Sequence, residues 1–259
     1  MNSDNYTITI THLYPDYMNI YGDIGNVIAL KQRCMWRGYK VIVKNVSIGE
    51  ALPADTDIYF IGGGQDEDQL EVNKDLIKKK DILIEQVESG VSLLSICGGF
   101  QLLGKKFFSG DKKVINGIGL MDIYTEAPSR VVSARAMGNV IAKINPAVFS
   151  INQNTWDTVV GFENHSGQTI LSEGMQPFGK VIYGQGNNAH DKTEGCVYKN
   201  AIGTYLHGAF LPKNPHIADW LVERSMKRKY KSFSLTKLSD NDEIEAHKAI
   251  LHRFTGVRE

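Results

Sequence analysis

The sequence is poor in cysteine and has no excess of charge of either sign. Its three cysteines, Cys34, Cys97 and Cys196, are far apart in a chain of 259 residues. An odd and scattered set of this kind argues against a disulfide framework and for a reducing, cytoplasmic compartment. The 29 basic and 29 acidic residues balance, whereas binding to nucleic acid or a membrane surface normally needs a basic excess. We therefore expect neither kind of binding.

Long apolar runs, repeats and metal-ligand spacings are also missing. No apolar segment approaches the roughly 18 residues that span a bilayer, and residues 1–5 have neither the basic nor the apolar region of a secretory signal. No CxxC or HxxxH spacing provides ligands for a structural zinc ion. We expect a single domain over residues 1–259 that is not integral to a membrane and holds no metal.

Short apolar runs alternate with helical patterns through the first half of the chain. Such alternation predicts an α/β fold in which helices cover both faces of a mostly parallel sheet. Ligand sites in such sheets lie beyond the carboxyl ends of the strands. The expected strands are residues 6–10, 41–43, 57–61 and 91–96, and the expected helices are residues 25–37, 75–89 and 98 to about 105.

Beyond about residue 114 the segments become short, turn-rich and strand-like, which predicts a small antiparallel extension of the same domain. The basic run at 227–231 follows a helical pattern, and we interpret it as a solvated helix end favoured by the helix dipole. The expected strands are 131–134, 158–162, 179–183, 195–198 and 201–205, and helices at 215–227 and 242–254 make up a C-terminal helical segment over about 215–259.

Cys97 stands between an apolar strand and an apolar helix, in the segment SICGGFQLLG of residues 95–104. This is the layout of a nucleophile elbow, in which a sharp turn presents a reactive side chain. The N-terminus of the following helix brings partial positive charge near the sulfur and so favours the thiolate, which is the reactive form. We interpret Cys97 as a nucleophile and the other two cysteines as core residues.

A thiolate that attacks a carbonyl needs donors for the oxyanion and a base. Backbone N–H groups of Gly63 and Gly64, in the triple glycine after an apolar strand, and of Gly98 are the candidate donors. His207 ends an apolar strand and is followed by glycine, so it is the candidate base, with His165 as the runner-up. The remaining histidines have surface or terminal contexts and are interpreted as bystanders: His12, His190, His216, His247 and His252.

Two glycine-containing segments imitate nucleotide-binding motifs. Residues 99–106 come close to a P-loop but lack the final Ser or Thr, and the interior of the segment is an apolar helix. Residues 184–189 imitate a dinucleotide fingerprint, but a polar turn follows them instead of a helix. We expect no cofactor in this chain.

The order GGG, CGGFQ and TYLHG along the chain resembles the triad (class I) glutamine amidotransferases, and in particular their cobyric-acid-synthase branch. The segments YMNIYGDIGN (17–26), GFENH (161–165) and GTYLHG (203–208) extend this over nearly the whole chain to the GatD family, the amidotransferase subunits of lipid II isoglutaminyl synthase. The resemblance implies a three-layer fold with a mostly parallel central sheet, and hydrolysis of L-glutamine.

The resemblance also implies roles for individual residues. Cys97 would be the nucleophile and His207 the acid and base. Arg130 matches the position of a glutamine-binding arginine, and a guanidinium there can hold the substrate α-carboxylate by two hydrogen bonds. Gln101, one helical turn past Cys97, is a further candidate for contact with the substrate.

The sequence departs from the wider class at the third member of the triad. Many class I enzymes carry a glutamate two residues after the histidine, but that position is Ala209 here. The orienting carboxylate is therefore either remote in the sequence or supplied by another chain. The resemblance implies an aspartate of a MurT-like Mur ligase subunit, which would carry ATP and magnesium and amidate the D-glutamate of lipid II. We then expect weak glutaminase activity from the isolated chain.

Two other functions stay open at this point. One is an amidotransferase for a corrinoid precursor, although such enzymes usually include a fused ATP-binding domain that this sequence lacks. The other is a cysteine hydrolase or peptidase on a related α/β fold, or an inactive scaffold with the same elbow.

Overall fold

Five parallel strands and one antiparallel strand form the central sheet of the computed structural model, which describes residues 6–108, 114–127, 135–149 and 156–256. The sheet has the order β13-β14-β4-β3-β1-β2, and only β13 runs antiparallel to its neighbour. Its strands are β1 (Thr7–Leu13), β2 (Lys40–Val46), β3 (Ile58–Ile61), β4 (Ser92–Ile96), β13 (Cys196–Tyr198) and β14 (Ala201–Thr204).

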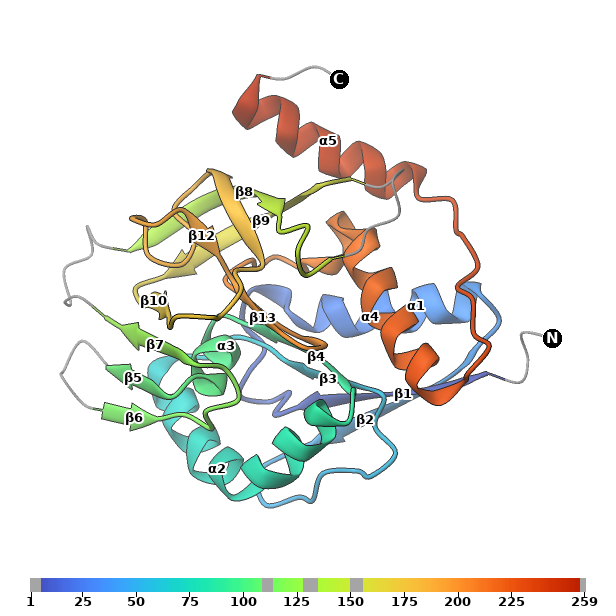
Figure 1. Cartoon of the computed structure of the whole chain (residues 1–259), viewed down its shortest axis with the longest axis horizontal. Coiled ribbons are helices and arrows are strands. Elements are labelled where there is room, and N and C mark those ends of the chain that lie inside the picture. The colour runs from blue at the N-terminus through green and yellow to red at the C-terminus, as the bar shows by residue number, and fades with distance from the viewer. Residues whose placement is uncertain (1–5, 109–113, 128–134, 150–155, 257–259) are drawn as a thin grey trace.

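Helices cover both faces of this sheet, as the sequence predicts (Figure 1). Helices α1 (Ile24–Trp36) and α4 (Pro215–Lys229) pack together on one face, and α2 (Asp66–Glu88) and α3 (Gly98–Leu103) lie on the other. All residues of β3 and β4 are buried between these layers, which explains why both strands are continuous apolar runs. Truncation of a core side chain such as Leu94 to alanine should cost about 2–5 kcal/mol.

Helix α2 begins nine residues before its expected start at residue 75. Its first turn contains Asp66, Glu67 and Asp68, and carboxylates near a helix N-terminus are stabilised by the helix dipole. These three residues carry no apolar periodicity, so the apolar pattern alone places the start too late. The earlier start matters because it brings the first turn of α2 to the carboxyl edge of the sheet.

Among the described residues, the extension of the fold is larger than expected and consists of two four-stranded sheets. The strands expected in it at 195–198 and 201–205 instead belong to the central sheet, where they are β13 and β14. In the first, with the order β10-β7-β5-β6, β5 and β7 are parallel and the other pairs are antiparallel; the second is antiparallel, with the order β12-β11-β8-β9. The strand expected at 131–134 lies outside the described residues. The strands are β5 (Lys106–Phe108), β6 (Val114–Asn116), β7 (Ile123–Glu126), β8 (Ala136–Ile144), β9 (Thr158–His165), β10 (Gln168–Leu171), β11 (Gly179–Tyr183) and β12 (Thr193–Glu194).

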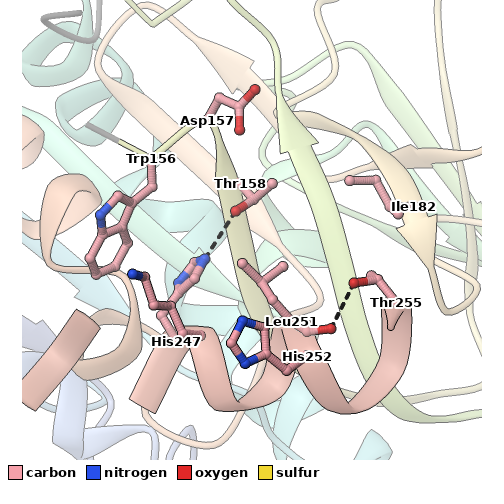
Figure 2. Close-up of a pocket in the computed structure, with 9 residues that line it drawn as sticks. Trp156, Asp157, Thr158, Ile182, His247, Leu251, His252 and Thr255 are labelled. Atoms are coloured by element: carbon pink, nitrogen blue, oxygen red, sulfur yellow. Dashed lines mark hydrogen bonds between the residues drawn. The ribbon is translucent and has the colours of Figure 1, made fainter. Parts of the chain in front are cut away.

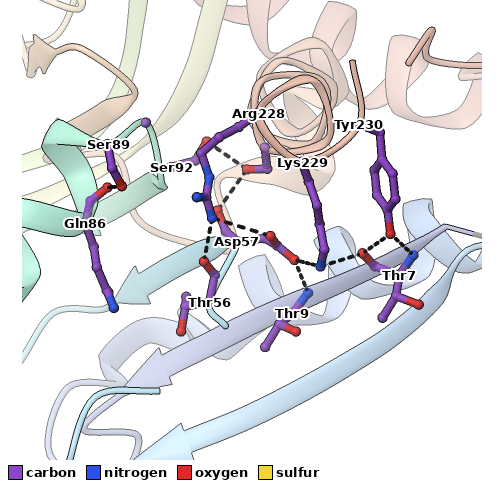
Figure 3. Close-up of polar contacts among 12 residues, drawn as sticks. Thr7, Thr9, Thr56, Asp57, Gln86, Ser89, Ser92, Arg228, Lys229 and Tyr230 are labelled. Carbon is purple, nitrogen blue, oxygen red and sulfur yellow. Dashed lines mark hydrogen bonds and ion pairs between the residues drawn. The ribbon is translucent and has the colours of Figure 1, made fainter. Parts of the chain in front are cut away.

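The basic end of α4 is exposed, as the sequence predicts, and it is also tied to the sheet by ion pairs. Figure 3 shows Arg228 and Lys229 reaching the carboxylate of Asp57, at distances of 3.6 and 2.8 Å. Asp57 is buried and also accepts a hydrogen bond from the backbone N–H of Thr9. Without these two cations the buried charge of Asp57 would be unpaired, so the contacts fix α4 at the edge of the sheet opposite to the carboxyl ends of the strands.

A second ion network fixes the segment that leads to the last helix, α5 (Asn241–Thr255). The buried Arg33 of α1 forms ion pairs with Asp219 of α4 at 2.8 Å and with Asp240 at 2.7 Å. Arg37 adds a contact to Asp219 at 2.7 Å. Within the described residues, no helix is long and apolar enough to cross a bilayer.

Candidate active site

Cys97 occupies a strained turn between β4 and α3, as the elbow prediction requires. Its backbone has φ 49° and ψ −107°, a region that residues with a side chain seldom adopt and that costs on the order of 1–3 kcal/mol. The turn also needs Gly99, because a Cβ there would lie 2.7 Å from the carbonyl oxygen of Gly62. The other two cysteines are buried, and burial raises the pKa of both thiols to about 12. They therefore stay protonated at neutral pH.

His207 is held next to this turn by its backbone and by its ring. The backbone exchanges two hydrogen bonds with Phe162 of β9, with N···O distances of 2.7 and 3.3 Å. The ring Nδ1 lies 3.2 Å from both carboxylate oxygens of Asp23. Since a carboxylate only accepts, Nδ1 carries the proton and Nε2 is the nitrogen left for chemistry. Nε2 is buried and has no hydrogen-bond partner among the described residues.

The charge on His207 is set by its neighbours Cys97 and Asp23. Burial alone lowers the pKa of an imidazole, but the nearby Cys97 and the carboxylate of Asp23 outweigh it and raise the pKa to about 10. Both His207 and Asp23 are fully buried, so solvent screens these interactions weakly. The His207 ring is therefore an imidazolium at neutral pH.

Asp23 is a functional candidate that the sequence interpretation did not identify. It lies just before α1, in the loop that follows β1, and is 184 residues from His207. Asp23 is thus a candidate, from the same chain, for the carboxylate that is missing at Ala209. This is the remote alternative considered from the sequence, whereas the resemblance implied an aspartate of a partner subunit. The one sequence signal was its place in the YGDIGN segment, between glycines at the carboxyl edge of the sheet.

Gly63 was expected to donate its N–H to the oxyanion, but in the structure it supports the Asp23–His207 pair. Its N–H donates to Asp23 Oδ2 at 2.8 Å, so this group is not free to stabilise an oxyanion. A Cβ at Gly63 would lie 2.7 Å from Cε1 of His207. Only glycine allows the imidazole to sit against this turn.

Gly64 and Gly98 retain N–H groups that can face an oxyanion. The carbonyl of Gly63 accepts a hydrogen bond from the N–H of Ile20 at 3.2 Å, and the N–H of Gly64, in the same trans peptide, points the opposite way. Gly98 is the first residue of α3, where an N–H has no partner within the helix. In the described part of the chain neither N–H donates a hydrogen bond.

Cys97 opens into a cavity of about 530 Å³ with walls of opposite charge. The first turn of α2 provides one wall with Asp66, Glu67 and Asp68, and Arg135 lies on the wall formed with residues 164–167. A free amino acid carries one positive and one negative group on its α-carbon, so a cavity polarised in this way suits it.

Arg135 is a second candidate that the sequence interpretation missed. Its guanidinium is exposed and hydrogen-bonds to the side chain and backbone carbonyl of Asn164. These contacts leave donors free to hold a carboxylate. Arg130, which the resemblance implied for this role, lies outside the described residues.

Two other expected residues line the same cavity. Gln101 is buried, and its Nε2 donates to the hydroxyl of Tyr205 at 3.1 Å. His165, the runner-up base, stacks on Tyr205 with ring centroids 3.6 Å apart and donates from Nδ1 to the carbonyl of Gly167 at 2.7 Å. The nearest carboxylate, that of Glu163, lies 3.8 Å from Nε2 of His165, beyond hydrogen-bond distance, and accepts the N–H groups of Gln185 and Gly186 instead. His207, whose Nδ1 contacts Asp23 at 3.2 Å, is therefore the better base.

A second cavity, of about 230 Å³, lies between α5 and the strands β9 and β11 (Figure 2). His247 on its wall contacts Thr158 Oγ1 through Nε2 at 3.0 Å and the carbonyl of Lys213 through Nδ1 at 2.8 Å. Both ring nitrogens of His247 therefore connect α5 to neighbouring segments and are not free to act as a base. None of the residues that line this cavity is a cysteine, and the described residues contain no group of three ligands that could hold a metal ion.

The triad geometry at the carboxyl edge of the sheet agrees with the match of residues 9–215 to the CobB/CobQ-like glutamine amidotransferase domain. The chain belongs to this glutamine amidotransferase family. The amidotransferase is 41% identical, over 96% of each chain, to the lipid II isoglutaminyl synthase (glutamine-hydrolyzing) subunit GatD of Staphylococcus aureus. It is 39% identical to the subunit of the same name from Streptococcus pneumoniae, over 87% of this chain and 83% of that one.

More distant relatives support the fold. A probable cobyric acid synthase of Methanothermobacter thermautotrophicus is 30% identical over 66% of this amidotransferase but only 33% of its own length. Among solved structures, PurLQS from Thermotoga maritima superposes with a TM-score of 0.56 and 14% identity, over 87% of this chain and 96% of that one. At such identity the likeness shows the fold alone, which is the class I amidotransferase fold that the sequence predicts.

Proposed function

We propose that the chain hydrolyses L-glutamine through a thioester on Cys97 and delivers the ammonia to a partner subunit. The observation that carries this proposal is the contact between His207 Nδ1 and Asp23, 3.2 Å apart, beside the strained turn of Cys97. A cysteine, an oriented imidazole beside it and N–H groups without a partner are what acyl transfer requires. The described residues contain no group of three ligands that could bind a metal ion and so activate a water molecule as the nucleophile.

In the first half of the reaction, the Cys97 thiolate attacks the side-chain amide carbon of glutamine. The N–H groups of Gly64 and Gly98 stabilise the oxyanion that develops on the carbonyl oxygen. The C–N bond then breaks, and Nε2 of the His207 imidazolium gives its proton to the departing nitrogen, which leaves as ammonia. A γ-glutamyl thioester remains on the enzyme.

In the second half, neutral His207 removes a proton from a water molecule that attacks the thioester carbonyl. The carbon–sulfur bond breaks, the thiolate is restored, and glutamate leaves. Asp23 stabilises the imidazolium in both halves through Nδ1. Arg135 holds the α-carboxylate of the substrate, and the acidic first turn of α2 faces its α-ammonium group.

We further propose that the partner is a MurT-like Mur ligase that binds ATP and magnesium and amidates the D-glutamate of lipid II. Both GatD relatives are named as subunits of lipid II isoglutaminyl synthase, and the chain covers 96% and 83% of their lengths. The match to a probable cobyric acid synthase covers only a third of that protein, so an independent amidotransferase for a corrinoid precursor is the weaker alternative.

The decisive experiment uses the complex of the chain with its Mur-ligase-like partner and compares two nitrogen sources. Cys97→Ala should abolish amidation of lipid II with glutamine and leave amidation with ammonium chloride close to that of the wild type. Cys34→Ala is the matched control, and it should retain both reactions. Glutamine-dependent turnover by Cys97→Ala would disprove the mechanism, and amidation of a corrinoid precursor in place of lipid II would disprove the acceptor.

A further inference from the structure

Gln69 of α2 contacts both glycines to which we assign the oxyanion donors. Its Nε2 donates to the carbonyl oxygen of Gly64 at 3.0 Å. Its amide group also covers Gly98 so closely that a Cβ there would lie 2.8 Å from both Cδ and Nε2 of Gln69. One side chain therefore lies between the loop after β3 and the first residue of α3.

The direction of this amide is fixed by its contact with Gly64. A carbonyl oxygen only accepts hydrogen bonds, so the side-chain atom of Gln69 that faces it is the NH₂ group. The side-chain oxygen, Oε1, is then buried and has no hydrogen-bond partner among the described residues. An unpaired buried acceptor costs about 1–3 kcal/mol, whereas a methionine of similar shape would avoid this cost. Methionine would also leave the carbonyl of Gly64 without this donor, so the gain in stability from glutamine over methionine at this position is small.

We propose that Gln69 is a positioning residue that holds the N–H groups of Gly64 and Gly98 in the geometry of the oxyanion hole. The hydrogen bond from Gln69 to the carbonyl of Gly64 holds the loop after β3 in place. The amide group of Gln69 also packs against Gly98 and so sets the distance between this loop and the first residue of α3. Preorganised donors stabilise the transition state because they need no rearrangement as charge develops. The proposal rests on the proposed glutaminase reaction and adds a residue on the wall of the Cys97 cavity that acts on kcat through the two glycines.

The test compares Gln69→Met and Gln69→Glu with Asn73→Met in the full chain, assayed for glutaminase activity in complex with the partner. Asn73 is the matched control because it lies one turn further along α2, and its amide also donates to a backbone carbonyl, that of Asn116. It does not line the cavity of Cys97. Asn73→Met should keep the wild-type kcat.

Gln69→Met should lower kcat by about 10- to 100-fold and leave KM within about threefold, since removal of an oxyanion donor costs about 10²–10³ in kcat. Alkylation of Cys97 by iodoacetamide, which forms no oxyanion, should proceed at the wild-type rate. In Gln69→Glu, only the protonated acid can donate to Gly64. The ratio of its kcat to that of the wild type should therefore rise as the pH falls, while the ratio for Gln69→Met stays flat.

The inference is overturned if Gln69→Met keeps kcat within twofold of the wild type. It is also overturned if turnover and alkylation fall together, because that result indicates a general disturbance of the site. A wild-type complex without glutaminase activity would overturn the proposed function and this inference together. An active wild type with unaffected Gln69 variants would overturn the inference alone.

Discussion

Asp23 and His207 are in direct contact at the centre of the site, although 184 residues separate them in the sequence. Both side chains are fully buried, and the carboxylate also accepts the N–H of Gly63 at 2.8 Å. The orientation of the imidazole is therefore built into this chain. The carboxylate that contacts His207 thus comes from this chain and not from a partner subunit.

Asp23→Asn should lower kcat for glutamine hydrolysis by about 10²–10⁴-fold, because an amide cannot stabilise the imidazolium and can present N–H to Nδ1. The measurement is steady-state release of glutamate by the isolated chain and by the complex with its partner. Asp16→Asn is the matched control, since Asp16 is an exposed carboxylate in the same loop, and it should leave kcat unchanged.

The two assays distinguish the two possible sources of the carboxylate. If a partner aspartate orients His207, Asp23→Asn should be nearly silent in the complex, and the isolated wild-type chain should be almost inactive. If Asp23 does so, the loss should be similar in both assays. Activity of the isolated wild-type chain within tenfold of the complex would therefore count against the weak activity expected from the sequence.

The raised pKa of His207 predicts the basic side of the pH profile. Burial lowers this pKa, but Cys97 and Asp23 raise it to about 10 in total. Because the folded pKa lies above the ordinary value of 6.5, the charged pair stabilises the fold fully below pH 6.5, and this contribution is lost as the pH rises through about 10. We expect kcat/KM for glutamine to stay level from pH 7 to 9 and to fall near pH 10.

Asp23→Asn should move that fall to lower pH, because one of the two groups that raise the pKa of His207 loses its carboxylate. Residual activity of the variant is measured over the same buffers, with Asp16→Asn as control. A basic limb at the same pH in wild type and Asp23→Asn would show that another group controls it.

The sequence predicted the parts of the site that lie next to their own strands. Cys97, the triple glycine and His207 each follow an apolar run, and the carboxyl ends of β4, β3 and β14 meet at one edge of a parallel sheet. Local patterns were enough because each residue is close in sequence to the strand that positions it.

The remaining parts depend on contacts between distant segments. Asp23 follows a loop and a short helical turn after β1, and only the fold brings it to His207. The use of the Gly63 N–H by Asp23 follows from the same contact. Arg135 precedes β8, a strand that the sequence did not predict because its apolar residues do not alternate regularly.

Arg135→Met should raise KM for glutamine by about 10- to 100-fold, because hydrogen bonds to charged groups contribute about 1.5–3 kcal/mol. Arg135→Lys should recover part of the loss, since it keeps the charge but not the paired donors. The same substitution at Arg130 tests the residue that the resemblance implied. A larger rise in KM for Arg130→Met than for Arg135→Met would assign the α-carboxylate to Arg130.

The buried carboxyl group of Glu194 should make the free energy of unfolding fall as the pH rises, an effect that is measured without any assay of activity. Glu194 is fully buried, and burial together with the nearby Glu163 raises the pKa of its carboxyl to about 7. Hydrogen bonds from Thr204 and from the backbone of Tyr205, and the nearby His207, lower this pKa but do not outweigh burial. Its second oxygen has no hydrogen-bond partner among the described residues. Ionisation therefore leaves a poorly compensated buried charge.

The sign of the effect follows from the two pKa values. The unfolded chain releases the proton of Glu194 near pH 4.5 and the folded chain near pH 7, so the free energy of unfolding falls as the pH rises between them. The loss for this group is on the order of 3 kcal/mol, at about 1.36 kcal/mol per pKa unit. Glu194→Gln keeps an acceptor for Thr204 and Tyr205 but cannot ionise.

Urea denaturation of wild type and Glu194→Gln from pH 4.5 to 8 measures this difference. The stability of Glu194→Gln relative to the wild type should increase steadily with pH over this range and level off above pH 7. Lys105 and Asp122 form an exposed ion pair, so Asp122→Asn is a suitable control that should show no comparable trend. A constant difference between Glu194→Gln and wild type at all pH values would mean that Glu194 ionises at an ordinary pKa in the folded protein.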